Sequence, residues 1–386
     1  MRALPVLRSR LVNAPLRILY LSPTCLADRR RKTIRGVQVF DMFFMRDLCA
    51  LGHHITLPAE RTWKPRLREY LGAEIDSGKI KVVYTPRLIK PLWNGLWAGL
   101  WLRGKWDIGF VGNSTKGIVP VVDFMLWRGL FKKVVIQASK QPPPNFSEAC
   151  DRWPCVITTL SAFVSSGFLA HQRARAVVYY GVVGAEMYTP GPKQLTGEGG
   201  EDGLVHFGLV GLLDNPWKGG PVALEAMGKL PADVAPRVRL HMMSYLDKPE
   251  CDDERIVFHG WRRPGEIPDM LRRMDALLVP SSAGETFSQA MVQGMLTALP
   301  VITSNLPVLT EKLDAGGGLL AAGSGELAER MAELTRDAAA RRDMGERGRE
   351  VALARYVWNT AEFVERFMRG KSAEEMAYVG RGQTAS

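Results

Sequence analysis

Two short loops in the second half of the chain combine glycine with a charged side chain at the end of a buried strand. Glu285 follows Gly284 after the apolar run 276–279, and a helical pattern that we expect to begin near Thr286 comes next. Lys218 stands in a loop that begins at Gly211 and ends in two glycines. Free N–H groups in the first turn of a helix bind phosphate, whereas a carboxylate accepts hydrogen bonds from sugar hydroxyls. These residues together predict a site for a phosphorylated sugar.

The elements around these loops form two alternating series of strands and helices. In the first, a strand at 16–22, a helical pattern ending at Gly52 and a strand at 54–57 make a βαβ unit. Further strands of this series are expected at 81–84, 108–112, 134–138, 156–160 and 176–180. After a stretch rich in Gly and Pro at 188–203, a second series is expected at 204–210, 238–242, 256–258, 276–279 and 300–303. The pattern predicts two Rossmann-like α/β domains with ligands at the carboxyl ends of their parallel strands.

Composition narrows the class of protein. The chain has 386 residues, of which 46% are hydrophobic and 24% charged, values typical of a globular protein and not of a disordered one. The five cysteines are scattered without a CxxC pair, which argues against a zinc site or a disulfide framework and favours a reducing cytoplasm. No segment reaches the roughly 18 uncharged apolar residues of a spanning helix.

The net charge of +11 is unevenly distributed. Residues 1–190 carry 28 basic and 12 acidic residues, whereas residues 191–386 carry 23 basic and 28 acidic ones. Such asymmetry indicates that the first half meets an anionic partner. Nucleic acid is the weaker candidate because no helix-turn-helix, zinc-finger or RNA-binding aromatic motif accompanies the basic residues.

With these loops and this order of elements, the sequence resembles a family 4 glycosyltransferase, a member of the retaining, nucleotide-sugar-dependent group with the two-domain GT-B fold. The similarity covers roughly residues 17–368, and its pieces occur in family order. They are Gly36-Val37-Gln38, the segment 52–56, Gly181-Val182-Val183, Lys218-Gly219, Phe258-His259-Gly260-Trp261, the Glu285 loop, Glu311 with Gly318-Leu319-Leu320, and a closing Tyr356-Val357-Trp358 helix. The resemblance implies an acceptor domain at 1–187 joined by a C-terminal helix at about 360–386, a linker at 188–203, and a donor domain at 204–359.

The resemblance also implies roles for single residues. Glu285 would contact the donor sugar and Lys218 the leaving diphosphate. Donor-binding positions would be Gly211, Gly219, Thr286, Phe287, Ser288, Gln293, Gly260, Trp261 and Arg262, and acceptor-side positions Arg35, Gly36, Ser139 and Lys140. Three places depart from the family pattern. The family's His after the fourth strand of the first domain is not evident, and Ser139 and Lys140 stand near that place. Gln293 replaces the second acid of the Glu-x7-Glu motif, and Leu212 stands where the family commonly has Arg.

The implied reaction is metal-independent, retaining transfer of a hexosyl-type unit from a UDP-, GDP- or dTDP-linked donor. No cofactor is expected, because the nucleotide sugar is a co-substrate. The acceptor would be anionic, such as a lipid-linked or cell-envelope glycan in polysaccharide biosynthesis. Because of Leu212 and Gln293, a catalytically degenerate binding or scaffold protein is the alternative, and a non-transferring GT-B enzyme such as an epimerase is a third.

A tryptophan-rich segment at 91–101 has two possible locations. Trp93, Trp97 and Trp101 share one face of an expected helix, while Gly95 and Gly99 lie near another face. Either this helix packs inside the first domain through its glycines, or it lies on a membrane surface, where Trp is favoured. Residues 88–105 are therefore a candidate peripheral membrane contact, at the inner face of the membrane for a cytoplasmic protein.

Overall fold

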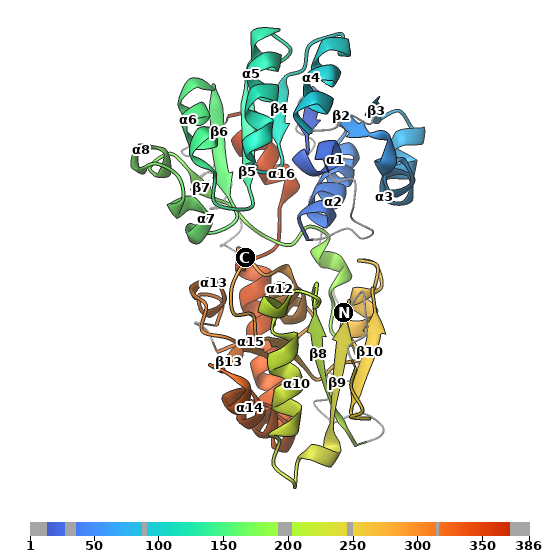
Figure 1. The fold of residues 1–386 in the computed structure, drawn as a ribbon, viewed down its shortest axis with the longest axis vertical. Helices are drawn as coiled ribbons and strands as arrows, with labels where there is room; N and C mark the ends of the chain where they lie inside the picture. The colour runs from blue at the N-terminus through green and yellow to red at the C-terminus, as the bar shows by residue number, and fades with distance from the viewer. Residues whose placement is uncertain are drawn as a thin grey trace, which may run out of the picture.

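The computed structural model describes residues 14–27, 36–86, 91–191, 203–244, 250–313 and 316–370 of the chain. Two α/β domains lie one above the other, each built on a parallel sheet with helices on both faces (Figure 1). Buried apolar clusters on the two sides of each sheet form the cores. The predicted pair of doubly wound domains is confirmed.

The sheet of the first domain has the strand order β3-β2-β1-β4-β5-β6-β7, and all neighbours are parallel. Its central strands are buried on both faces, which explains their unbroken apolar runs. The strands are β1 (Arg17–Leu21), β2 (His54–Glu60), β3 (Ile80–Thr85), β4 (Ile108–Val111), β5 (Val134–Ala138), β6 (Cys155–Thr159) and β7 (Val177–Val178).

The sheet of the second domain has the order β10-β9-β8-β11-β12-β13, again with parallel neighbours. Its strands are β8 (Val205–Val210), β9 (Val238–Met243), β10 (Ile256–Gly260), β11 (Ala276–Val279), β12 (Val301–Thr303) and β13 (Gly318–Leu320). The edge strand β13 has only three residues and was not predicted as a strand from the sequence.

Helices connect the strands and cover both faces of each sheet (Figure 1). Those of the first domain are α1 (Pro23–Ala27), α2 (Gly36–Ala50), α3 (Lys64–Asp76), α4 (Pro91–Trp101), α5 (Val119–Trp127), α6 (Pro144–Arg152), α7 (Ala162–Ser166) and α8 (Ala170–Arg173). Those that follow are α10 (Gly220–Gly228), α11 (Ile267–Leu271), α12 (Gln289–Leu296), α13 (Pro307–Thr310), α14 (Ser324–Arg336), α15 (Ala338–Arg355) and α16 (Thr360–Phe363).

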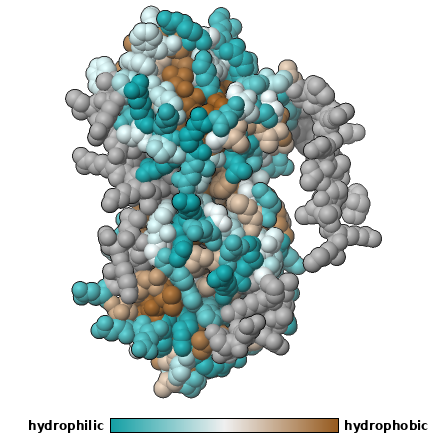
Figure 2. Space-filling view, turned by 90° about the vertical axis from the view of Figure 1, so that its right-hand side faces the viewer, coloured by the Kyte–Doolittle hydropathy of each residue, from teal (hydrophilic) through white to brown (hydrophobic). Residues whose placement is uncertain are grey.

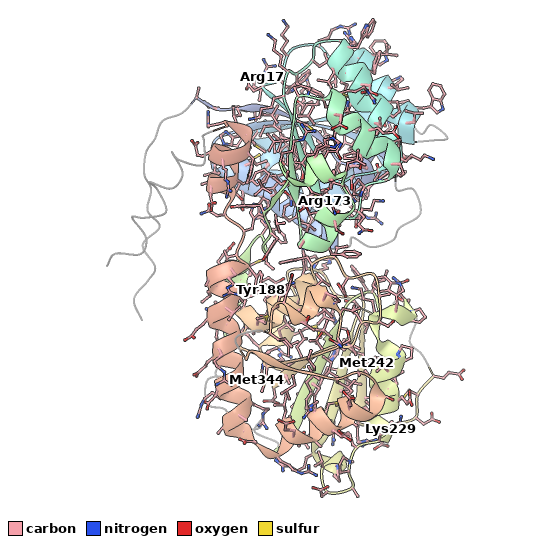
Figure 3. All side chains as sticks on the ribbon, turned by 90° about the vertical axis from the view of Figure 1, so that its left-hand side faces the viewer. Arg17, Arg173, Tyr188, Lys229, Met242 and Met344 are labelled. Atoms are coloured by element: carbon pink, nitrogen blue, oxygen red, sulfur yellow. The ribbon has the colours of Figure 1, made fainter. Side chains whose placement is uncertain are left out.

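The chain crosses between the domains twice, and the two crossings lie side by side. Val182 pairs with Val357 in an isolated β-bridge, and a Cβ on Gly181 would lie 2.4 Å from the backbone nitrogen of Trp358. The expected closing helix at 356–358 is therefore wrong, because this segment is extended to pair with the first crossing. Beyond it, α16 places Phe363 in the core of the first domain. Tyr188 lies at the junction of the two domains (Figure 3). The boundaries at 187 and 203 stay predictions.

Candidate active site

A cleft of about 850 Å³ opens between the two domains at the carboxyl ends of both sheets. Each sheet reverses its strand order there, between β1 and β4 in the first domain and between β8 and β11 in the second. Such switch points leave a crevice between diverging loops, and ligands bind in it. The charged side chains among the described lining residues are four cations and one carboxylate: Lys116, Lys140, Lys218, Arg262 and Glu285. The cleft therefore favours an anionic ligand.

Glu285 and Lys218 meet within this cleft. Lys218 Nζ lies 2.5 Å from Glu285 Oε1, and the Ser281 hydroxyl donates a hydrogen bond of 2.8 Å to the same oxygen. Glu285 is only 8% exposed, so the ammonium and the hydroxyl replace much of the water that a carboxylate requires. The Lys218 ammonium also lies 4.8 Å from the centre of the Trp217 ring. This arrangement fixes one carboxylate oxygen in place.

Two glycines interlock the loops that carry these side chains. Gly219 has φ +81° and lies so close to the next loop that a Cβ would be 2.2 Å from the Pro280 carbonyl oxygen. Gly284 has φ +70°, and a Cβ there would lie 2.9 Å from the Trp217 ring. The backbone N–H of Ser282 also donates to Trp217 O at 2.8 Å. Any larger residue at either glycine would separate Lys218 from Glu285.

The helix after Glu285 begins later than the sequence indicates. It begins at Gln289, and Ser288 precedes it with a left-handed φ of 61°. The expected start near Thr286 is therefore wrong: Thr286, Phe287 and Ser288 form a short loop that lines the cleft. The Phe287 side chain is buried against Tyr180 and Tyr356, so only its backbone is available for a phosphate.

Most of the other residues predicted to bind the donor line the side of the cleft that the second domain forms. Gly211, Gln293, Trp261 and Arg262 line the cleft, whereas Gly219 and Gly260 are not among its described lining residues. In the described structure the Nε of Arg262 is buried without a hydrogen-bond partner, and its nearest carboxylate is Glu266 at 3.9 Å. The neighbouring Arg263 pairs instead with Glu69 of the first domain at 3.4 Å.

The acceptor-side predictions are only partly brought together. Gly36 and Lys140 line the cleft, and a Cβ on Gly36 would lie 3.8 Å from the Gln289 side chain across it. Ser139 is buried beside Lys140, and its hydroxyl has no hydrogen-bond partner among the described residues. Arg35 lies outside the described residues.

Sequence reasoning missed several residues that line the cleft or support it. Asn113 and Lys116 follow β4 and lie at the switch point of the first sheet. Their position directly after a predicted strand could have indicated this. Trp217, whose ring lies against the Lys218 ammonium, was also missed.

Behind Phe287 lies Lys312, which is buried, with its ammonium 5.1 Å from the Phe287 ring centre and 3.0 Å from Glu311 Oε1. Burial lowers the pKa of Lys312, against the opposing effect of Glu311. Among the described residues, no group of three or more metal-ligating side chains could hold an ion.

Comparisons with known proteins identify the fold. Residues 205–337, nearly the whole second domain, match the sequence model of a family described as "Glycosyl transferases group 1". The HepE protein of Anabaena, solved with UDP and glucose, is 17% identical with a TM-score of 0.66 and 95% and 99% coverage of this chain and that one. Sucrose-phosphate synthase from Thermosynechococcus elongatus is 14% identical with a TM-score of 0.64 and coverages of 95% and 98%.

A glycosyltransferase from Rickettsia africae is similar as well, at 14% identity and a TM-score of 0.63, with 97% of this chain and 100% of that chain covered. None of the curated proteins matches this chain by sequence. The chain therefore has the GT-B fold, and its second domain carries the glycosyltransferase group 1 pattern. Membership of family 4 stays a prediction.

Proposed function

We propose that the protein is a family 4 glycosyltransferase that moves a hexosyl-type unit from a nucleotide sugar to an anionic acceptor, with retention of configuration. The observation that carries the proposal is the Lys218–Glu285 pair at the switch point of the second domain. It lies in a cleft whose described lining has four cations and one carboxylate. UDP and UDP-glucose bound to the similar HepE protein support a nucleotide-sugar donor.

In this proposal the second domain binds the donor. Lys218, Arg262 and the backbone N–H groups of residues 286–288 stabilise the diphosphate as negative charge develops on it. Such fixed donors contribute to the rate because they need no reorganisation during the reaction. The second Glu285 oxygen is left to accept hydrogen bonds from donor-sugar hydroxyls, since Oε1 is held by Lys218 and Ser281.

The pairing of Glu285 supports retention. A general base must accept a proton, and a carboxylate held 2.5 Å from an ammonium is a poor acceptor. No other carboxylate is among the described residues that line the cleft. A leaving phosphate oxygen would then take the acceptor proton on the face where the acceptor attacks. The reaction requires no metal or cofactor in this scheme.

The first domain would bind the acceptor. Lys116 and Lys140 are exposed at its wall of the cleft, and the domain holds the basic excess of the sequence. An acceptor with a phosphate or carboxylate, such as a lipid-linked or cell-envelope glycan, fits this wall. A cytoplasmic location would give access to nucleotide sugars.

The test is binding followed by transfer. A thermal-shift screen of UDP, GDP and dTDP should show stabilisation by one of them, about 2.7 kcal/mol at a concentration of 100 Kd. NMR of the product made from the matching nucleotide sugar should show the anomeric configuration of the donor retained. Stabilisation by none of the three nucleotides, or an inverted product, would contradict the proposal.

A degenerate binding protein is the second candidate because Leu212 and Gln293 both line the cleft in place of charged residues. The protein would then bind a nucleotide sugar without transferring it. Transfer by the purified chain that is lost in Glu285→Gln and retained in the distant Glu225→Gln excludes this candidate. Donor epimerisation without acceptor would instead identify a non-transferring enzyme.

A further inference from the structure

The first domain exposes an aromatic patch on its two neighbouring helices α4 and α5. Its members are unusually exposed for large apolar side chains: Trp127 by 81%, Trp101 by 61%, Leu100 by 55% and Trp93 by 54%. Trp97 lies against Trp101 with ring centres 5.9 Å apart, and Phe124 stacks on Trp127 at the same separation. We call these six residues the aromatic patch. Clustered exposure of this kind marks an interaction surface.

Glycines explain why the tryptophans face outward. A Cβ on Gly95 would lie 2.5 Å from the Val121 side chain, and one on Gly99 would lie 3.0 Å from Phe124. Helix α4 therefore packs tightly on α5 through its glycine face. Trp93, Trp97 and Trp101, spaced four residues apart, form a stripe along another face. The glycine face of α4 is thus internal, as the first alternative expected, whereas Trp93 and Trp101 are exposed and Trp97 is half-buried. The membrane contact stays a prediction.

Basic side chains lie next to the aromatic patch at the C-terminal end of α4. Helix α4 contains no charged residue, but Arg103 and Arg128 both donate to the carbonyl of Leu100 at its last turn. Trp106 N donates to Leu130 O at 2.8 Å, which places the loops of Lys105 and Lys132 side by side. The acidic Asp123 of α5 is directed to Arg152 and Trp153 instead. Cations thus border the aromatic patch.

The location of the patch fits docking along a surface. Arg17, at the start of β1, lies at the end of the first domain away from the cleft (Figure 3). A Cβ on Gly104 would lie 3.2 Å from the Arg17 guanidinium, so the basic loop after α4 is at that same end. Figure 2 shows hydrophobic surface amid hydrophilic residues on one face of the upper domain; tryptophan is nearly white on this scale, so the exposed fractions and not this colouring define the aromatic patch. Within the described residues, no helix is long and apolar enough to cross a bilayer.

We propose that the aromatic patch docks the first domain on an anionic lipid bilayer, with α4 lying in the headgroup region. Tryptophan rings prefer this region, and the bordering Arg and Lys side chains reach lipid phosphates while their methylene stems stay in contact with apolar surface. An aromatic patch bordered by cations fits an anionic bilayer better than a protein partner, whose groove would have to match the six apolar side chains of the patch. The proposal does not depend on the proposed function.

Co-sedimentation of the full chain with vesicles tests this docking. One set contains phosphatidylcholine alone, and the other contains about 30% phosphatidylglycerol, each at low and at high salt. We expect at least roughly tenfold tighter binding to the anionic vesicles, weakened by salt. The variant Trp93→Ser/Trp101→Ser/Trp127→Ser should bind roughly tenfold or more weakly. The variant Lys105→Glu/Lys132→Glu should lose the preference for anionic lipid.

The matched control is Leu51→Ser/Phe163→Ser/Leu353→Ser, which removes three exposed apolar side chains outside the patch and should bind like the unchanged chain. Circular dichroism and melting of each variant establish that it folds. Glu285→Gln should also bind vesicles normally, which separates this test from that of the activity. Docking is refuted by absent binding at low salt, by equal loss in the control, or by a dimer in solution that the tryptophan variant dissociates.

Discussion

The two walls of the cleft are built in opposite ways. The wall from the second domain is paired at its carboxylate: Glu285 is held by Lys218 and Ser281, glycines lock their loops together, and among the described residues of this wall Arg262 Nε is the exception that lacks a partner. The wall from the first domain has buried polar atoms without partners among the described residues, Asn113 Oδ1 and Ser139 Oγ, beside two exposed lysines. A paired wall is organised before its ligand arrives, whereas an unpaired one is completed by the ligand. The donor wall should therefore be intolerant of change and the acceptor wall tolerant.

The buried carboxyl groups repeat this contrast. Glu285 in the second domain faces an ammonium, but the hydrogen bonds that Asp41 on α2 accepts within the described part of the first domain come from neutral hydroxyls, those of Tyr20 at 2.7 Å and Ser22 at 2.8 Å. Burial therefore raises the pKa of Asp41 to about 7, although both hydroxyls act in the opposite direction. One carboxylate is stabilised by charge and the other is not.

The largest effect is expected for Glu285→Gln. The amide keeps the size of the side chain but loses the ion pair with Lys218 and the charge that orients the sugar. Transfer should fall by roughly a thousandfold, the upper range for removing one fixed electrostatic contact. Steady-state rates with the matching nucleotide sugar measure this loss, and unchanged melting shows that the fold is intact. Near-normal rates would mean that the paired wall is not the reacting one.

The second prediction concerns Asp41→Asn and the pH dependence of stability. The pKa of Asp41 is about 7 in the folded chain, whereas an ordinary aspartate, as in the unfolded chain, has a pKa of 3.8. Between about pH 4 and pH 7 the folded chain therefore holds a proton on Asp41 that the unfolded chain has already released. Stability contributed by this protonation is present at low pH and lost as pH rises through the folded pKa.

Asn at position 41 should raise the unfolding free energy near pH 8 by a few kcal/mol, because the neutral amide avoids the buried charge, and should remove this part of the pH slope. Denaturant unfolding from pH 4 to pH 8 measures the difference. If the unfolding free energy depended on pH in the same way in the unchanged chain and in the Asp41→Asn variant, the expected proton linkage would be refuted.

Lys218→Met should lower transfer by about a hundredfold, because the diphosphate loses a cation but retains Arg262 and the loop N–H groups. Lys229→Met is the matched control, since Lys229 pairs with Glu225 on the outer surface of the second domain. Rate constants for both variants at saturating acceptor make the comparison. An equal loss in the control would place the effect outside the cleft.

The acceptor wall should respond more weakly. Lys116→Ala/Lys140→Ala should raise the KM for an anionic acceptor about tenfold while the KM for the donor stays unchanged, since each exposed cation contributes little alone. Lys64→Ala/Lys79→Ala, on the same domain away from the lining residues, serves as the control. A change in donor KM would show that the two walls do not divide the substrates as proposed.

A structural feature can be predicted from this sequence when the residues that determine it are close together in the chain. The strands follow from apolar runs because a buried parallel strand needs them, and the ends predicted for β5 and β11 are those of the structure. The tight loops at Gly219 and Gly284 also leave a local trace, since only glycine adopts their backbone angles at that contact distance. Such features are encoded within a few neighbouring residues.

Features set by distant residues could not be predicted in the same way. The extended segment at 356–358 results from pairing with Val182, far away in the sequence. The sequence shows that α4 has a tryptophan face, but only the packing of Gly95 on Val121 decides that this face is exposed. The positions of Asn113 and Lys116 in the cleft likewise depend on which strands become neighbours at the switch point.

The smallest effect is expected for Gln293→Glu, which tests the donor wall at its edge. Gln293 lines the cleft from α12, where an amide oxygen accepts a hydrogen bond without the help of charge. A carboxylate there should strengthen a hydrogen bond from a ribose hydroxyl and tighten nucleotide binding about threefold, because charge-assisted bonds are stronger but nearby phosphates repel the new charge. Gln289→Glu adds the same charge one turn earlier on the same helix and should weaken binding, since it gains only the repulsion. Calorimetric Kd values that move in the same direction for both variants would show that charge alone acts at this wall, and that Gln293 does not contact the ribose.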